Sequence, residues 1–347
     1  YWFWDPVENV ALMPWLTGTA LLHTTYVSAK SKHLIAWTIF LSILVFTLSL
    51  FGTFIVRSGI IESVHSFASD PTRGLYLLGI SAFLVFAPLV LFVKNLPRLL
   101  SINRIRDLSK EFFIGANNIF FITAVFIIFL GISYPLIIEA FSESRVSVGS
   151  PFYNKVFAPL TFLTAFFLVF STYSKWSRNV TSLEILKSSS FLIAVTTILS
   201  VITIFFIKKY EWWLIGGIFF SNLILIRYLV LFIDSKSSKK YINKGSALAH
   251  VGFALLILSV SLNSALSTEK TYSMSVNDAV DFNEYQIKFD RVSAETSSNF
   301  ESLSADFIFE NGNSSFTLFP EKRRYFVRGE ITTESAISIK PLKDIYI

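Results

Sequence analysis

The chain has 347 residues, of which 53% are hydrophobic and only 16% are charged. This balance is too apolar for a soluble domain and indicates a polytopic membrane protein. The net charge of +6 does not indicate nucleic-acid binding, because the basic residues lie in short clusters between apolar runs, and the lack of cysteine excludes disulfides, thiol catalysis and thiolate metal ligands.

Residues 1–15, YWFWDPVENVALMPW, form an aromatic segment at the edge of the first apolar run. Trp2, Trp4 and Trp15 surround a short polar stretch that begins at Asp5. Tryptophan offers a broad, stiff surface on which a flat apolar ligand stacks, but Trp and Tyr also collect in the ordinary aromatic belts of membrane proteins. Composition alone leaves both interpretations open.

Apolar runs long enough to cross about 30 Å of hydrocarbon, roughly 20 helical residues each, occur eight times. We therefore expect a polytopic α-helical membrane protein with about eight transmembrane helices in residues 1–266. Because the chain starts with Tyr inside a motif and not with Met, we also expect it to be an N-terminally truncated fragment. The runs fall near 10–29, 34–56, 74–93, 114–138, 156–174, 188–207, 212–233 and 247–266.

The basic residues between these runs predict the orientation of the helices. If residues 1–9 lie outside, every second loop lies inside, and these inner loops hold most of the basic residues that precede the last segment. Loops rich in Lys and Arg stay on the cytoplasmic side. We therefore expect the aromatic segment to lie on the outer face of the membrane.

Two histidines lie at matching depth in the membrane. His23 is about seven residues before Lys30, and His250 about six after Lys244, which puts both roughly 10 Å from the cytoplasmic ends of their helices. Such a pair suits the two axial positions of a b-type haem inside a helix bundle. An intramembrane histidine also serves to hydrogen-bond a neighbouring helix, so depth alone leaves this alternative open.

The other two histidines lie near helix ends. His65 sits in the loop VRSGIIESVHSFASDPTRG, between Arg57 and Arg73, on the predicted outer face. It could ligate the iron of a haem resting on the tryptophans while the arginines pair with the propionates, or all three could face solvent and lipid phosphates. His33 follows Lys32 at the start of a span, and we interpret it as an ordinary interfacial residue.

The last part of the chain has a different character. From about residue 267, apolar and polar residues mix in short β-prone stretches such as 285–289 and 307–309. We expect residues 267–347 to form a mainly β domain in the periplasm.

An ordered series of motifs covers nearly the whole chain. They are WFWDPVEN, MPW, GTALLH, LGTFIVRSG, SVHSFASDPTRG, the pair Asn117 and Asn118, VSVGSPFYN, LAHVGFA and FPEKRRY. In this order they resemble the CcmF-type haem lyases of cytochrome c maturation, members of the tryptophan-rich WWD group of haem-handling proteins. The resemblance assigns residues 1–15 to the WWD motif. It also implies a location in the bacterial inner membrane, with the WWD motif and the C-terminal domain facing the periplasm.

The resemblance implies two haem sites. A b-type haem in the membrane would have His23 and His250 as axial ligands and would relay reductant. A transient haem substrate would rest on the outer tryptophan surface, with His65 as one iron ligand. The catalytic residues that we expect are His65, Trp2, Trp4 and Asp5, and further haem contacts come from Trp15, Arg57 and Arg73, while the second outer histidine would precede this chain.

The resemblance also implies partners. A CcmE-type chaperone would deliver haem, and a CcmH-type subunit would present the CxxCH segment of apocytochrome c, whose two thiols the lyase joins to the haem vinyl groups. Three alternatives stay open: a CcmC-like haem exporter or chaperone without lyase activity, a lyase of the NrfE type dedicated to nitrite reductase, and a respiratory b-type cytochrome or ion-coupled transporter. Few charges lie within the spans, which disfavours a transporter.

Overall fold

The computed structural model divides the chain into a helical unit, residues 1–266, and a β unit, residues 267–347. It describes residues 2, 4–58, 71–100, 104–142, 146–207, 209–238, 243–312, 314–326, 331–341 and 343–347. His65 lies outside these ranges. We treat the two units separately.

The first helix has an unusually complete start. Helix α1, Pro6–Ser31, begins after Asp5, whose carboxylate accepts a hydrogen bond from the N–H of Val7 at 3.0 Å. The carboxylate of Glu8 reaches back to the N–H of Asp5 at 3.1 Å. This capping box satisfies amides that a helix start leaves unpaired, and Pro6 fits the first helical position because it lacks an N–H.

The apolar runs form helices, as the sequence predicts. Within the described residues the helical unit contains eight long helices, and seven of them are long and apolar enough to cross a membrane. The eighth, α1, falls outside this set by composition, because it carries polar residues such as Asn9, Thr17 and Thr24, which it buries against other helices. The other seven are α2 (Ile35–Ser58), α3 (Pro71–Leu99), α4 (Lys110–Phe141), α5 (Ser150–Ser171), α6 (Ser182–Ile204), α7 (Trp212–Ser238) and α8 (Lys244–Leu266).

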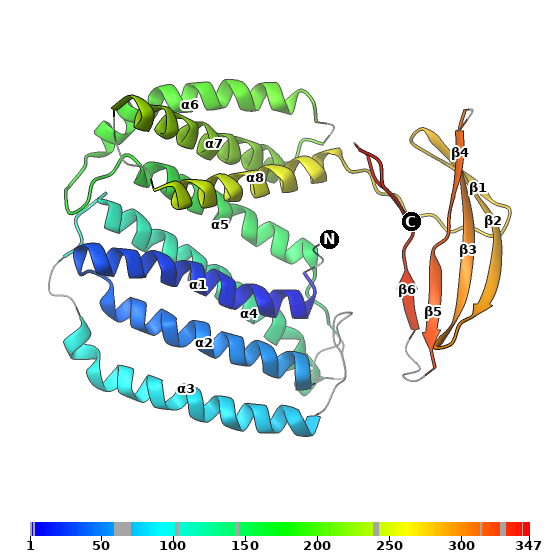
Figure 1. The fold of residues 1–347 in the computed structure, drawn as a ribbon, viewed down its shortest axis with the longest axis horizontal. Coiled ribbons are helices and arrows are strands. Elements are labelled where there is room, and N and C mark those ends of the chain that lie inside the picture. The colour runs from blue at the N-terminus through cyan, green and yellow to red at the C-terminus, as the bar shows by residue number, and fades with distance from the viewer. Residues whose placement is uncertain are drawn as a thin grey trace. The chain divides into compact units, whose positions relative to one another are not determined.

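Successive helices run in opposite directions, so the start of α1 and the end of α2 lie at one end of the helical unit (Figure 1). We call this end, which holds Trp4, the tryptophan end. The opposite end, where α4 begins at Lys110, is the basic end. Helix α1 packs on α2 and α4, α8 packs on α7, and α5 contacts both α4 and α7. The helices therefore form two groups that α5 connects.

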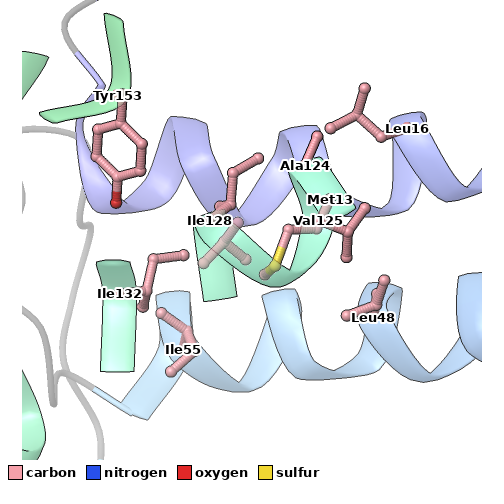
Figure 2. Close-up of a cluster of buried hydrophobic side chains, with 10 residues drawn as sticks. Met13, Leu16, Leu48, Ile55, Ala124, Val125, Ile128, Ile132 and Tyr153 are labelled. Atoms are coloured by element: carbon pink, nitrogen blue, oxygen red, sulfur yellow. The ribbon is translucent and has the colours of Figure 1, made fainter. Parts of the chain in front are cut away.

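Interlocking apolar side chains hold the first group together. Met13 of α1, Leu48 of α2 and Ile128 of α4 meet in one buried cluster (Figure 2). Tyr153 of α5 joins the same cluster and is almost completely buried. The hydroxyl of Tyr153 fills the space beside Gly131, where any β-carbon would collide with it. This close approach fixes α5 against α4.

The β unit is mainly an antiparallel sheet in the order β1-β2-β3-β5-β6, with β4 also paired to β3. The long strand β3 pairs with β5 through residues 300–304 and with β4 through residues 307–311. The bounds are β1 (Ala279–Phe282), β2 (Tyr285–Thr296), β3 (Phe300–Asn311), β4 (Ser314–Leu318), β5 (Glu321–Tyr325) and β6 (Ile331–Glu334), with a separate hairpin of β7 (Ile337–Ser338) and β8 (Ile345–Tyr346). The expectation of mainly β structure here is confirmed.

A small aromatic core closes the β unit. Phe309 of β3 stacks on Phe316 of β4, with ring centroids 5.0 Å apart, and Tyr285 packs edge-on against both. Arg291 of β2 forms an ion pair with the largely buried Asp306 of β3 at 2.6 Å, next to an irregularity in the β2–β3 register. Alternating inward residues therefore give this unit a core of its own.

Candidate functional site

His23 is held in one orientation by its own helix. Its Nδ1 lies 2.7 Å from the backbone carbonyl oxygen of Thr19, one turn earlier in α1. Because a carbonyl oxygen only accepts, Nδ1 must carry the proton in this contact, and in a neutral imidazole Nε2 then keeps its lone pair free. Thr19 in turn donates its hydroxyl hydrogen to the carbonyl oxygen of Trp15 at 2.9 Å. The imidazole of His23 is therefore held in an orientation that leaves Nε2 available as a metal ligand.

His250 has equivalent support from side chains. Its Nδ1 lies 2.8 Å from the hydroxyl of Tyr228 on α7 and 3.3 Å from the hydroxyl of Ser246, one turn earlier in α8. The ring of Tyr228 also lies nearly parallel to the imidazole, with centroids 5.3 Å apart. Partners on the far nitrogen fix the ring of a metal-binding histidine and raise its basicity. Within the described part of the chain, neither His23 nor His250 forms a hydrogen bond through Nε2.

The two imidazoles lie close together although they come from different helix groups. Their ring centroids are 6.2 Å apart and their planes differ by 48°. Two imidazoles on opposite sides of one metal ion, each at a bond length of about 2 Å, have centroids roughly 6 Å apart. The observed spacing therefore matches a bis-histidine metal site, although His23 and His250 come from opposite ends of the helical unit's sequence.

The surroundings limit the kind of metal site that the pair can form. The ring of Phe121 on α4 stacks on His23 at 6.3 Å, so the pair has an apolar wall. Within the described ranges, no three side chains of the His, Cys, Asp or Glu types gather to hold a metal ion by themselves. Two imidazoles in an apolar setting fit an iron whose remaining ligands come from a flat macrocycle.

Trp4 packs inward at the tryptophan end. Its ring stacks on Tyr153, with centroids 4.6 Å apart and planes within 11°, and also contacts Phe157. Its indole N–H donates to the side-chain oxygen of Asn154 at 3.0 Å, and its carbonyl accepts from the Asn9 amide at 2.9 Å. One face of Trp4 is therefore used to join the start of α1 to α5.

The three predicted tryptophans do not form one surface. Trp2 lies edge-on against Trp4, with centroids 5.9 Å apart, and is 46% exposed. Trp15 lies almost three turns further along α1 and is 59% exposed. The carboxylate of Asp5 caps the start of α1, so the contact of this residue is structural. Only Trp2 and Trp4 are brought together.

Arg57 and Arg73 lie at the same end as Trp4. Arg57 is in the last turn of α2 and Arg73 in the first turn of α3, and both are exposed. They flank Ser58 and Gly74, which touch so closely that a β-carbon on Gly74 would lie 3.0 Å from the α-carbon of Ser58. The two arginines therefore bracket the segment that contains His65, which itself lies outside the described residues.

His33 has a setting that the sequence did not indicate. Both of its ring nitrogens are buried, and neither has a hydrogen-bond partner among the residues that the structure describes. The residue borders an apolar cavity of about 520 Å³ together with Trp37, Phe40 and Phe92. This cavity lies between the start of α2 and the end of α3, apart from the His23–His250 pair.

Sequence reasoning missed Tyr228 and Asn154. It also missed Arg227 of α7, which precedes Tyr228 and donates a hydrogen bond to Thr172. Tyr228 is one of 13 tyrosines, and nothing in its sequence context marks it as the partner of His250. Asn154 lies in the motif VSVGSPFYN, which the resemblance includes but which says nothing of a contact with Trp4. Such long-range partners become visible only when the helices are assembled.

Comparison with known proteins supplies two matches to families. Residues 1–61 match the family described as cytochrome C assembly protein, and residues 265–347 match the CcmF C-terminal beta-sandwich. The chain is 32% identical over its whole length to the cytochrome c-type biogenesis proteins CcmF of Pseudomonas aeruginosa and Escherichia coli, and covers 54% of each. It is 31% identical to the NrfE protein of Haemophilus influenzae, covering 55% of it.

A solved structure shares the fold. The protein titled Cytochrome c Heme Lyase CcmF superimposes with a TM-score of 0.73 over 98% of this chain and 53% of its own length, at 21% sequence identity. The chain therefore spans about half the length of the relatives it matches.

Proposed function

Because the chain belongs to the CcmF family of cytochrome c-type biogenesis proteins, we propose that the full protein is a haem lyase subunit and that this chain carries its intramembrane b-type haem site. The observation that carries the proposal is the pair His23 and His250, with ring centroids 6.2 Å apart and each Nδ1 engaged. When bound, a bis-histidine haem supplies one-electron chemistry.

The chain's own residues hold and orient such a group. His23 and His250 would provide Nε2 from opposite sides, while the Thr19 carbonyl and the Tyr228 hydroxyl keep the imidazoles from rotating. The apolar wall at Phe121 excludes water from one side.

The tryptophan end would receive the haem that is to be attached. The exposed rings of Trp2 and Trp15 offer stacking surfaces, and Trp4 packs edge-on against Trp2. His65 would ligate the iron, and Arg57 and Arg73 would pair with the propionates. Asp5 would serve by capping α1 so that Trp4 and Trp2 keep their places.

The proposed reaction joins two cysteine thiols of apocytochrome c to the two vinyl groups of haem. A thiol adds across each vinyl double bond, so that one carbon–sulfur bond and one carbon–hydrogen bond form. This chain has no cysteine that would compete with the substrate thiols or trap them as disulfides. A CcmE-type chaperone would deliver the haem, and a CcmH-type subunit would present the reduced CxxCH segment.

Seven apolar helices make the chain a multi-pass membrane protein, and we propose that its tryptophan end faces the periplasm. The basic end carries clusters such as the one at residues 94–110, which supports a cytoplasmic location for that end. The match of residues 265–347 to a CcmF C-terminal domain favours a lyase over a CcmC-like exporter.

Cells that depend on the full-length protein for cytochrome c maturation test the proposal. We expect His23→Ala and His250→Ala each to lower covalent cytochrome c by about tenfold or more, because loss of an axial ligand exceeds the effect of losing a supporting contact. Haem staining of membrane proteins measures this. His33→Ala is the matched control and should leave cytochrome c at the wild-type level; normal levels in both other variants would contradict the proposal.

A further inference from the structure

A nearly buried arginine directly precedes Tyr228, the partner of His250, and forms no ion pair with a carboxylate among the described residues. Arg227 of α7 is 8% exposed and directly precedes Tyr228. Its Nε donates to the hydroxyl of Thr172 at 2.6 Å, and Nη2 donates to the carbonyl of Thr172 at 3.4 Å. Its guanidinium lies 3.8 Å from the ring centroid of Tyr173. Among the described residues no carboxylate forms an ion pair with it, although Asp234, further along α7, interacts with its charge; Nη1 has no acceptor there.

A second cation lies at the basic end of the helical unit. Lys110, the first residue of α4, places its ammonium 5.8 Å from the ring centroid of Trp176. The adjacent carboxylate of Glu111 is already bound by the backbone N–H and the hydroxyl of Ser177, each at 3.0 Å. Within the described ranges the Lys110 ammonium has no acceptor either.

Aromatic contacts connect both cations to the histidines. Arg227 adjoins Tyr228, whose hydroxyl contacts His250. On the other side, Trp176 packs against Tyr26, with ring centroids 5.5 Å apart, and Tyr26 lies one turn after His23 on α1. Each cation is therefore linked to one histidine through neighbouring aromatic residues, and the charges of Lys110 and Arg227 also interact with each other.

Two partly buried positive charges are expensive in an apolar bundle, and within the described ranges neither Asp234 nor Glu111 forms an ion pair with them. Each would be stabilised by an anion that enters from the side of the histidines. Haem carries two propionate carboxylates on one edge, and the planar fork of arginine matches a carboxylate in two parallel hydrogen bonds. The geometry therefore suits a flat dianionic ligand whose centre lies at the histidines.

We propose that Arg227 and Lys110 bind the propionates of the haem held by His23 and His250 and so fix that edge toward the basic end. This inference rests on the proposed b-haem site. Thr172 and Tyr173 would act as positioning residues, since they hold the guanidinium in place. A phospholipid headgroup is the other source of anionic oxygens, and the experiment separates the two.

Reconstitution of the full-length protein tests the inference. The purified protein is stripped of haem and titrated with haem or with haem dimethyl ester, which lacks the carboxylate charges. We expect the wild type to prefer haem by about tenfold or more, and Arg227→Gln and Lys110→Gln to lower this preference severalfold while keeping the low-spin spectrum. Arg227→Lys should retain part of it, because the charge remains without the fork.

Arg104→Gln is the matched control, because Arg104 is exposed and its one ion pair within the described ranges is with Asp107, at 3.8 Å. The preference of this variant should equal that of the wild type. Equal affinity of the wild type for haem and its ester would overturn the inference while leaving the b-haem intact. If Arg227→Gln and Lys110→Gln keep the preference for haem but lose co-purified anionic lipid, the two cations bind a lipid headgroup and not the propionates.

Loss of the preference in Arg104→Gln as well would overturn the propionate inference. Absence of low-spin haem in the wild type would instead contradict the b-haem proposal itself.

Discussion

At the scale of single residues, the supporting contact of each imidazole decides what it can do. His23 depends on a backbone carbonyl, which no substitution removes, whereas His250 depends on the Tyr228 hydroxyl. The sequence predicts the two histidines as a pair because matching depth is visible in the spacing from helix ends. It does not predict Tyr228, because a partner 22 residues away on another helix has no local signal.

Replacing Tyr228 tests this support. We expect Tyr228→Phe to keep a low-spin haem, since His250 remains, but to weaken haem binding by about tenfold and to raise the reduction potential, because the imidazole loses basicity. Haem transfer to apomyoglobin and a potentiometric titration measure the two effects. Tyr134→Phe, at an exposed tyrosine of α4, is the control, and an unchanged affinity in Tyr228→Phe would show that the hydroxyl is not a functional support.

At the scale of elements, long apolar runs predict helices well and their environment poorly. All eight runs are helices, because about 20 consecutive apolar residues leave few alternatives. The run at 10–29 differs from the others because α1 is buried through polar positions such as Thr17 and Thr24, and apolarity alone does not distinguish a lipid-facing helix from a packed one. The contact of Tyr153 with Gly131 is equally invisible in sequence, since it depends on how closely α4 and α5 approach.

This contact gives an element-scale prediction. We expect Gly131→Ala to destabilise the helical unit by about 1–3 kcal/mol, because the new methyl group collides with the Tyr153 hydroxyl and forces α4 and α5 apart. Thermal unfolding of the full-length protein in detergent measures this. Adding Tyr153→Phe should recover part of the loss, and Gly79→Ala, where a β-carbon meets nothing within 4 Å, should cause none; equal stability of Gly131→Ala and Gly79→Ala would contradict the account.

At the scale of the whole molecule, the sequence predicts the fold class and the family, while the site depends on assembly. The ordered motifs resemble the CcmF family, and the chain matches the CcmF C-terminal beta-sandwich at residues 265–347 and the cytochrome C assembly protein family at residues 1–61. The outer tryptophan surface is only partly present in the form predicted, because Trp4 is used in packing on Tyr153 and Trp15 lies apart on α1. By contrast, His23 and His250 come together from the first and last helices although α1 and α8 each pack mainly on other helices.

The central claim is that His23 and His250 are the two axial ligands of one haem. The reduced-minus-oxidised optical spectrum of the purified full-length protein tests it most directly, compared among wild type, His23→Ala and His250→Ala. We predict a low-spin haem spectrum in the wild type that is lost or strongly reduced in both variants, because each leaves the iron with one protein ligand. A full low-spin spectrum in both alanine variants would contradict the claim.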